Sequence, residues 1–173
     1  MNCNIDTAHS HVEFSVRHLG ISTVRGRFRT FGGHAQTDDA GRLVQITAEI
    51  DPASLDTGVT QRDTHLRSPD FFDVASFPRM HFASIRVEPI GDHRYRAEGE
   101  LTMHGVKKPV TLEVELAAPI QDPWGKPRLG ATATGRIKRS DWGLTWNQAL
   151  ETGGFVVSDD VKIALEVEGA SAN

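Results

Sequence analysis

The densest cluster of polar side chains in the 173-residue sequence is the segment Arg62-Asp63-Thr64-His65-Leu66-Arg67. On a short helix Asp63 and Arg67 lie four residues apart and can form an ion pair. Two roles are open for this segment: it forms a polar mouth that holds the head group of a ligand, or it fixes the helix over one end of the fold. An alternative function is an enzyme that acts on an apolar substrate through Arg62, Asp63 and His65.

The eight histidines raise the question of a metal site. His9 and His11 would share one face of a strand, but a structural or catalytic zinc site needs three or four ligands. No nucleophile elbow, P-loop or dinucleotide-binding glycine pattern is present, and Cys3 is expected on a mobile end. We therefore expect no metal, no cofactor and no catalytic residue, and a binding protein is favoured over an enzyme.

Composition limits the class of protein. The length suits one domain over residues 1–173, and 38% hydrophobic and 24% charged residues are ordinary for a globular chain. The net charge is −4 with no basic stripe, which argues against nucleic acid as the main partner. No apolar run is long enough for a transmembrane helix. No apolar signal region precedes Cys3, so the chain as given is expected to be cytoplasmic.

Apolar and polar residues alternate along most of the chain, which is the period of half-buried strands. Residues 11–18 place Val12, Phe14, Val16 and His18 on one face. Residues 24–37 are predicted to form one long strand, and residues 43–50 a strand with Val44, Ile46, Ala48 and Ile50 on one face. Five more strands are predicted at residues 80–88, 95–103, 110–117, 128–138 and 159–168.

Eight strands joined mostly by tight turns predict an all-β fold, an eight-stranded antiparallel up-and-down barrel that closes by pairing its first and last strands. A short helical insert is expected at about residues 52–77, with helices over 59–67 and 68–74, and a second, Gly- and Trp-rich insert at 140–157. At about 3.4 Å per residue, residues 24–37 would span roughly 45 Å. A tall apolar interior suits a long hydrocarbon better than a compact metabolite.

Several segments resemble the YceI family of polyisoprenoid-binding, lipocalin-like proteins, and they follow one another along nearly the whole chain. They are Ile5-Asp6-Thr7-Ala8-His9-Ser10, Gly26-Arg27-Phe28, Arg62-Asp63-Thr64-His65-Leu66-Arg67-Ser68, Asp70-Phe71-Phe72-Asp73, Gly99-Glu100-Leu101-Thr102-Met103-His104-Gly105 and Ile137-Lys138-Arg139-Ser140-Asp141-Trp142-Gly143-Leu144. The resemblance implies an extended barrel that binds amphipathic lipids with polyisoprenoid or long acyl tails. It also implies a homodimer.

The apolar strand residues have two interpretations: they fill a solid core, or they line a ligand cavity. The resemblance to the YceI family favours the ligand cavity. The ligand is expected to be a long-chain isoprenoid lipid, such as an isoprenoid quinone or polyprenyl derivative, which the protein sequesters or transports. The residues expected around its apolar tail are Phe14, Val16, Phe28, Phe71, Phe72, Phe77, Met80, Phe82, Leu101, Trp142 and Trp146. The tryptophan pair lines a portal or forms a small separate core. The residues expected at its polar head are His18, Arg62, Asp63, His65 and Arg67.

Overall fold

The alternating segments form one sheet in the computed structural model, which describes residues 1–172. Its strands are β1 (Asn2–Ile5), β2 (His11–His18), β3 (Ser22–Phe28), β4 (Phe31–Thr37), β5 (Leu43–Ile50), β6 (Leu55–Asp56), β7 (Met80–Gly91), β8 (Arg94–Met103), β9 (Val106–Leu116), β10 (Ile120–Gln121), β11 (Pro127–Lys138) and β12 (Val157–Ser171). Since β11 pairs with both β9 and β12, eight strands close into a ring in the order β11–β9–β8–β7–β5–β4–β1–β12. The predicted eight-stranded antiparallel barrel is confirmed.

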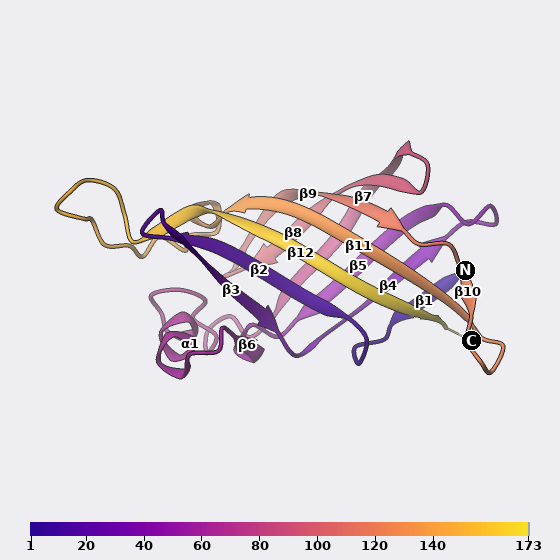
Figure 1. Cartoon of the computed structure of the whole chain (residues 1–173), viewed down its shortest axis with the longest axis horizontal. Coiled ribbons are helices and arrows are strands. Elements are labelled where there is room, and N and C mark those ends of the chain that lie inside the picture. The colour runs from indigo at the N-terminus through magenta and orange to yellow at the C-terminus, as the bar shows by residue number, and fades with distance from the viewer. Residues whose placement is uncertain (173) are drawn as a thin grey trace.

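The barrel has two distinct ends (Figure 1). At one end, here called the helix end, lie α1 (Thr60–Arg67), the 3₁₀ turn η2 (Arg139–Trp142) and the turn between β2 and β3. At the other, the terminus end, lie β1, β10 and both ends of the chain. The longest strand, β12, has 15 residues and spans about 50 Å at roughly 3.4 Å per residue. The height expected for the barrel is therefore provided by β12 rather than by residues 24–37.

The single long strand predicted over residues 24–37 is wrong. The chain breaks at Arg29 and Thr30 into β3, which pairs with β2 and β6, and β4, which pairs with β1 and β5. At the break the amides of Arg29 and Thr30 donate to the carbonyl and hydroxyl oxygens of Ser54, at 3.2 and 2.9 Å. The backbone amides at the break are thus hydrogen-bonded to the short η1 turn (Pro52–Ser54). The alternation of apolar and polar residues along a strand cannot predict such a contact.

A β-bulge corrects the predicted inner face of β5. Thr37 pairs with Leu43 and Gln36 with Gln45, so Val44 has no cross-strand partner. The extra residue turns Val44 out into solvent and places Leu43 in the core. Ile46, Ala48 and Ile50 face inward as predicted.

The insert contains one helix rather than the two predicted. The predicted helix over 59–67 matches α1, but residues 68–74 form turns. Their amides bond back to the end of α1, with Phe72 donating to the Leu66 carbonyl at 3.0 Å and Val74 to the Arg67 carbonyl at 3.1 Å. Within residues 1–172, no helix combines the length and the apolar character that a membrane crossing requires.

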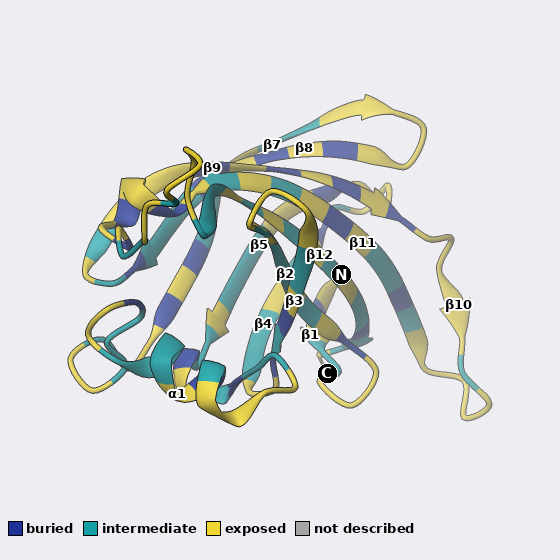
Figure 2. Cartoon of the chain, turned by 60° about the vertical axis from the view of Figure 1, so that its left-hand side comes forward, coloured by how far each residue is buried: buried dark blue, intermediate teal, exposed yellow. Residues whose placement is uncertain are grey.

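Buried and exposed residues follow one another along the strands of the wall (Figure 2). This is expected when successive side chains point to opposite faces of a sheet. On β9, Val110, Leu112, Val114 and Leu116 are buried, while the residues between them are exposed. The period of two therefore directs one apolar set of side chains toward the barrel axis.

A network of ion pairs around Arg128 ties the terminus end together. Its guanidinium contacts three carboxylates, those of Asp6 at 2.9 Å, Glu168 at 3.2 Å and Asp122 at 3.3 Å. Asp6, His9 and Glu168 also form the one group among residues 1–172 whose ligand atoms are close enough to hold a metal ion. The carboxylates of Asp6 and Glu168 are already paired with the positive charge of Arg128. His11, which the sequence places on the same strand face as His9, does not belong to this group.

Arg128 makes the stability of this end depend on pH. Hydrogen bonds from His9 and Arg128 lower the pKa of Asp6, and those from the Lys126 and Trp124 amides, with Arg128, lower the pKa of Asp122. Because both values fall on folding, the carboxylates stabilise the fold above an unfolded-state pKa of about 3.9. That stabilisation is lost as the pH falls through the folded-state values.

We therefore expect Arg128→Gln to lower the melting temperature at pH 7. This deficit should be smaller at pH 2.5, below the unfolded-state pKa, where part of the stabilisation by the carboxylates is lost. Thermal unfolding at the two pH values measures it. The control is Arg94→Gln, which removes one exposed ion pair to Glu113 and should change stability little. An equal deficit for Arg128→Gln at both pH values would contradict the electrostatic role.

Candidate functional site

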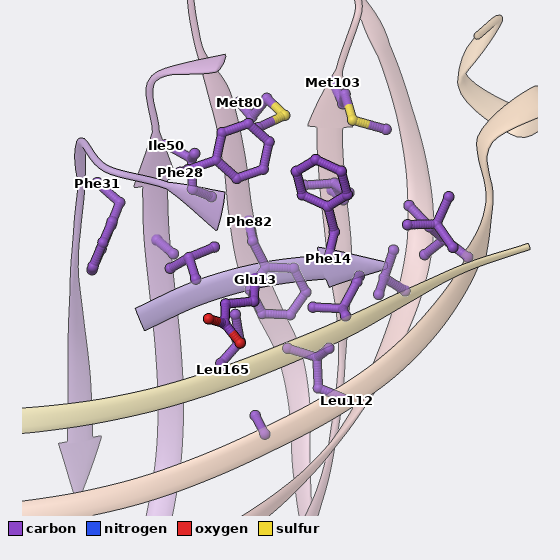
Figure 3. Close-up of a pocket in the computed structure, with 18 of the residues that line it drawn as sticks. Glu13, Phe14, Phe28, Phe31, Ile50, Met80, Phe82, Met103, Leu112 and Leu165 are labelled. Carbon is purple, nitrogen blue, oxygen red and sulfur yellow. The ribbon is translucent and has the colours of Figure 1, made fainter. Parts of the chain in front are cut away.

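The centre of the barrel is hollow. A cavity of about 440 Å³, here called the barrel cavity, is lined by inward side chains of β2, β3, β4, β5, β7, β8, β9, β11 and β12. Figure 3 shows Phe14, Phe28, Phe82, Met80 and Met103 directed toward this shared space. Most lining side chains are aliphatic or aromatic, so the cavity can hold a hydrocarbon. The charged and imidazole side chains in the lining are those of Glu13, Arg17, His18, His34, Arg62, His65 and Arg139.

Glycines explain why large side chains leave the centre open. A Cβ atom on Gly26 would lie 2.4 Å from the ring of Phe14, its partner in the β2–β3 register. A Cβ atom on Gly135 would likewise lie 2.7 Å from Leu112, its partner in the β9–β11 register. One on Gly99 would lie 2.6 Å from the ring of Phe82 on the neighbouring strand β7. Each side chain therefore lies against a bare stretch of wall instead of crossing the barrel axis.

Nine of the eleven residues expected around the tail line the barrel cavity. They are Phe14, Val16, Phe28, Phe71, Phe72, Met80, Phe82, Leu101 and Trp146. Phe28 stands between Phe14 and Phe72, with ring centroids 5.4 and 5.9 Å away. Phe14, Phe28 and Phe72 therefore form a continuous row of aromatic rings along one side of the cavity.

Phe77 and Trp142 lie outside the cavity lining. The Phe77 ring packs on His104 with centroids 4.7 Å apart. Trp142 is buried, and its indole Nε1 donates to the Leu101 carbonyl at 3.0 Å. The two tryptophans thus lie in different surroundings. Trp142 is packed into the hydrophobic core without lining the cavity, whereas Trp146 lines the cavity beside His65 and Phe71.

Of the residues expected at the polar head, His18, Arg62 and His65 line the barrel cavity at the helix end. Asp63 and Arg67 do not. Asp63 is buried and accepts hydrogen bonds from the amide and hydroxyl of Thr57, at 3.0 and 2.5 Å. Arg67 donates to the carbonyls of Ala53 and Leu55, at 2.8 and 2.7 Å. Both residues fix the insert to the barrel, and they bond to these partners rather than to each other.

Sequence reasoning missed Arg139, a cavity-lining residue only 6% exposed. Its guanidinium donates to the carbonyls of Leu144 at 2.7 Å, Trp146 at 2.8 Å, Ser158 at 2.9 Å and Val157 at 3.4 Å. Burial lowers its pKa, partly offset by the nearby Asp159 carboxylate. Arg139 therefore brings a buried positive charge to the helix end and holds the 143–156 loop against it.

Cys3 was expected on a mobile end, and that expectation is wrong. It lies in β1, paired with Ala35 of β4 and Ser171 of β12, and is buried. Its side chain lines the barrel cavity at the terminus end, and burial raises the pKa of the thiol. The cavity lining therefore extends from Arg62 and His65 at the helix end to Cys3 at the other.

Comparison with known proteins agrees with this architecture. The YceI-like domain family model matches residues 4–169. A UPF0312 protein of Yersinia pestis is 39% identical over 162 residues, which cover 93% of this chain and 81% of the relative. One from Vibrio vulnificus is 39% identical over 143 residues, covering 81% and 76%.

Solved structures share the fold. Burkholderia cenocepacia BcnA superposes with a TM-score of 0.82 at 25% identity, covering 95% of this chain and 98% of that one. The Campylobacter jejuni YCEI protein gives 0.79 at 31% identity, covering 91% and 90%. A polyisoprenoid binding domain from Saccharophagus degradans gives 0.71 at 18% identity, covering 98% of each chain, which shows a common fold. By sequence and structure together, the chain belongs to the YceI-like family.

Proposed function

We propose that the barrel cavity binds one amphipathic lipid with a long isoprenoid or acyl tail, and that the protein sequesters or transports this lipid. The observation that carries the proposal is the hollow apolar interior of about 440 Å³, within the range of about 300–1,000 Å³ typical of ligand pockets. The name of the Saccharophagus degradans domain, a polyisoprenoid binding domain with the same fold, supports a lipid ligand.

The cavity lining favours affinity through buried area. Each methylene group removed from water contributes about 0.8 kcal/mol, so a long tail needs no hydrogen bond to be retained. Isoprenoid quinones and polyprenyl derivatives have such tails. The head group is placed at the helix end, where His18, Arg62 and His65 line the cavity.

Binding is favoured over catalysis by the geometry of Arg62, Asp63 and His65. An enzyme using all three would present them to the substrate together, yet Asp63 bonds to Thr57 and lies outside the cavity lining. His65 is hydrogen-bonded to Asp70 at 2.8 Å. We propose no cofactor other than the lipid itself, and the homodimer stays a prediction.

The expected result is that gently purified protein carries lipid. Native mass spectrometry should give a mass above the 19.0 kDa of the chain, and organic extraction should release the ligand for identification. Phe14→Asp should abolish loading, because an ionised carboxylate in an apolar cavity is strongly disfavoured.

The matched control is Ser15→Asp, which places the same carboxylate on the outer face of the same strand, beside Arg25 and Lys162. Loading should then be unchanged. The proposal is lost if the gently prepared protein holds no lipid and none can be loaded. Full occupancy in a folded Phe14→Asp variant would refute the placement of the tail.

A further inference from the structure

Three apolar side chains project into solvent at the helix end. Leu19 and Ile21 lie in the turn between β2 and β3, and Phe155 lies just before β12; Ile21 is 78% exposed and Phe155 62%. The Leu19 amide donates to the Val156 carbonyl at 2.8 Å, which holds the turn and the loop side by side. We call these three residues the apolar tip.

The apolar tip lies next to the barrel cavity. A surface groove at this end is lined by Gly20 from the turn and Phe155 from the loop. Its lining shares Arg17, Arg139 and Leu144 with the barrel cavity. The apolar tip therefore lies beside the end of the barrel cavity where we propose that the lipid head group lies.

A row of cations crosses the outer wall near the same end. Arg25 of β3 pairs with Ser15 of β2, Ser15 with Lys162 of β12, and Lys162 with Arg136 of β11. We call Arg25, Lys162 and Arg136 the basic row. Lys162 and Arg136 stand directly opposite each other, an arrangement that destabilises a sheet. Within residues 1–172 no carboxylate forms an ion pair with any of the three.

Charge is arranged differently on the rest of the barrel. On the outer wall of β7, β8 and β9, Arg96 stands between Glu88 and Glu113, so opposite charges alternate. The chain as a whole carries a net charge of −4. A row of cations with no carboxylate paired directly opposite in the sheet is therefore a local feature that the sheet does not need for stability.

The terminus end provides an internal comparison. Trp124 and Ile120 are also exposed there, at 81% and 65%. The nearby Arg128 is surrounded by three carboxylates, including that of Asp122. Exposed apolar side chains thus occur at both ends. Among residues 1–172, Lys126 beside Trp124 also forms no ion pair, but it stands alone, whereas three such cations lie side by side near the helix end.

We propose that the helix end docks on the surface of an anionic phospholipid bilayer. The apolar tip inserts into the head-group region, as apolar side chains of interfacial segments do to a depth of about 5–10 Å. The basic row begins four residues from Ile21, about 13 Å along the strand. With the tip inserted by about 5–10 Å, the row is left about 3–8 Å from the head-group region. That is within about one Debye length, roughly 8 Å at physiological salt. Docking in this orientation presents the barrel cavity to the membrane.

The test is sedimentation of the full chain with vesicles of phosphatidylglycerol and phosphatidylcholine in equal parts, against pure phosphatidylcholine. We expect binding to the anionic vesicles only, reduced by added salt. The triple variant Arg25→Gln/Lys162→Gln/Arg136→Gln should bind on the order of 100-fold more weakly, because each cation near an anionic surface contributes about a fivefold factor. Ile21→Ser/Phe155→Ser should weaken binding at least tenfold.

The matched control is Trp124→Ser/Ile120→Ser, which removes equally exposed apolar residues from the terminus end and should bind like the parent protein. Docking is overturned if the protein does not bind vesicles, or if it binds neutral and anionic vesicles equally. It is also overturned if the triple variant binds like the parent protein, or if the control variant binds as weakly as Ile21→Ser/Phe155→Ser. Binding of double-stranded DNA through the basic row, without vesicle binding, would also overturn it. The readout is protein in the pellet, so an empty barrel cavity, which would end the proposed function, leaves this test unaffected.

Discussion

Replacing Ala133 by phenylalanine is expected to abolish lipid loading while the barrel stays folded. Ala133 lies on β11, lines the barrel cavity and pairs with Leu165 on one side and Val114 on the other. A benzyl group at this position extends into the space assigned to the tail. In a dense core such a change costs about 1–3 kcal/mol through overpacking, whereas a hollow centre receives the ring with little strain.

Lipid occupancy measured by native mass spectrometry should fall at least tenfold in Ala133→Phe, with the melting temperature retained. The control is Thr134→Phe on the outer face of the same strand, between Ala164 and Glu113, which should load normally. Normal loading of Ala133→Phe would show that the tail lies elsewhere. Loss of the folded state would show that the centre has no room for a ring, which equally contradicts a hollow barrel.

The second large effect is expected for Arg139→Met, which should lower the free energy of unfolding by about 3–5 kcal/mol. Each buried carbonyl that loses its donor costs about 1–3 kcal/mol. Methionine fills similar space but donates no hydrogen bond. The carbonyls of Leu144, Trp146 and Ser158, now at 2.7–2.9 Å from the guanidinium, would lose their donor. Urea unfolding measures the change.

Two further variants separate charge from geometry. Arg139→Lys should recover only part of the stability, since an ammonium group cannot donate in the planar fork of a guanidinium. Arg136→Met removes an exposed arginine three residues away and should stay within about 0.5 kcal/mol of the parent. A value for Arg139→Met equally close to the parent would contradict the role assigned to Arg139.

Strand alternation was sufficient to predict the eight-stranded barrel, because a wall with one apolar face repeats every two residues. It could not show the break at Arg29 and Thr30, which depends on Ser54, a residue more than twenty positions away. Nor could it distinguish a filled centre from a hollow one. That difference depends on Gly26 lying opposite Phe14 and Gly135 opposite Leu112, pairs defined only by the strand register.

The face of α1 on which each residue lies explains why only some of the residues predicted at the polar head line the cavity. Arg62, His65 and Leu66 follow the i, i+3, i+4 spacing and line the cavity together. Asp63 and Arg67 share another face, so helical periodicity anchored on Leu66 would have separated the two groups.

Arg139 had a weaker signal. Ile137 faces inward and Lys138 outward, so alternation places Arg139 inward, although arginine is rarely buried. The sequence contains no signal for the basic row. Its residues lie far apart in the sequence, and only the β3–β2–β12–β11 pairing aligns them.

A crystal structure of the protein as purified is the most direct test of the hollow, lipid-filled barrel. Elongated electron density is expected through the cavity, from the side chains of Arg62 and His65 past Phe14 toward Cys3. A centre filled by Phe14, Phe28 and Phe82 packed across the barrel axis, with no channel for a hydrocarbon chain, would contradict it.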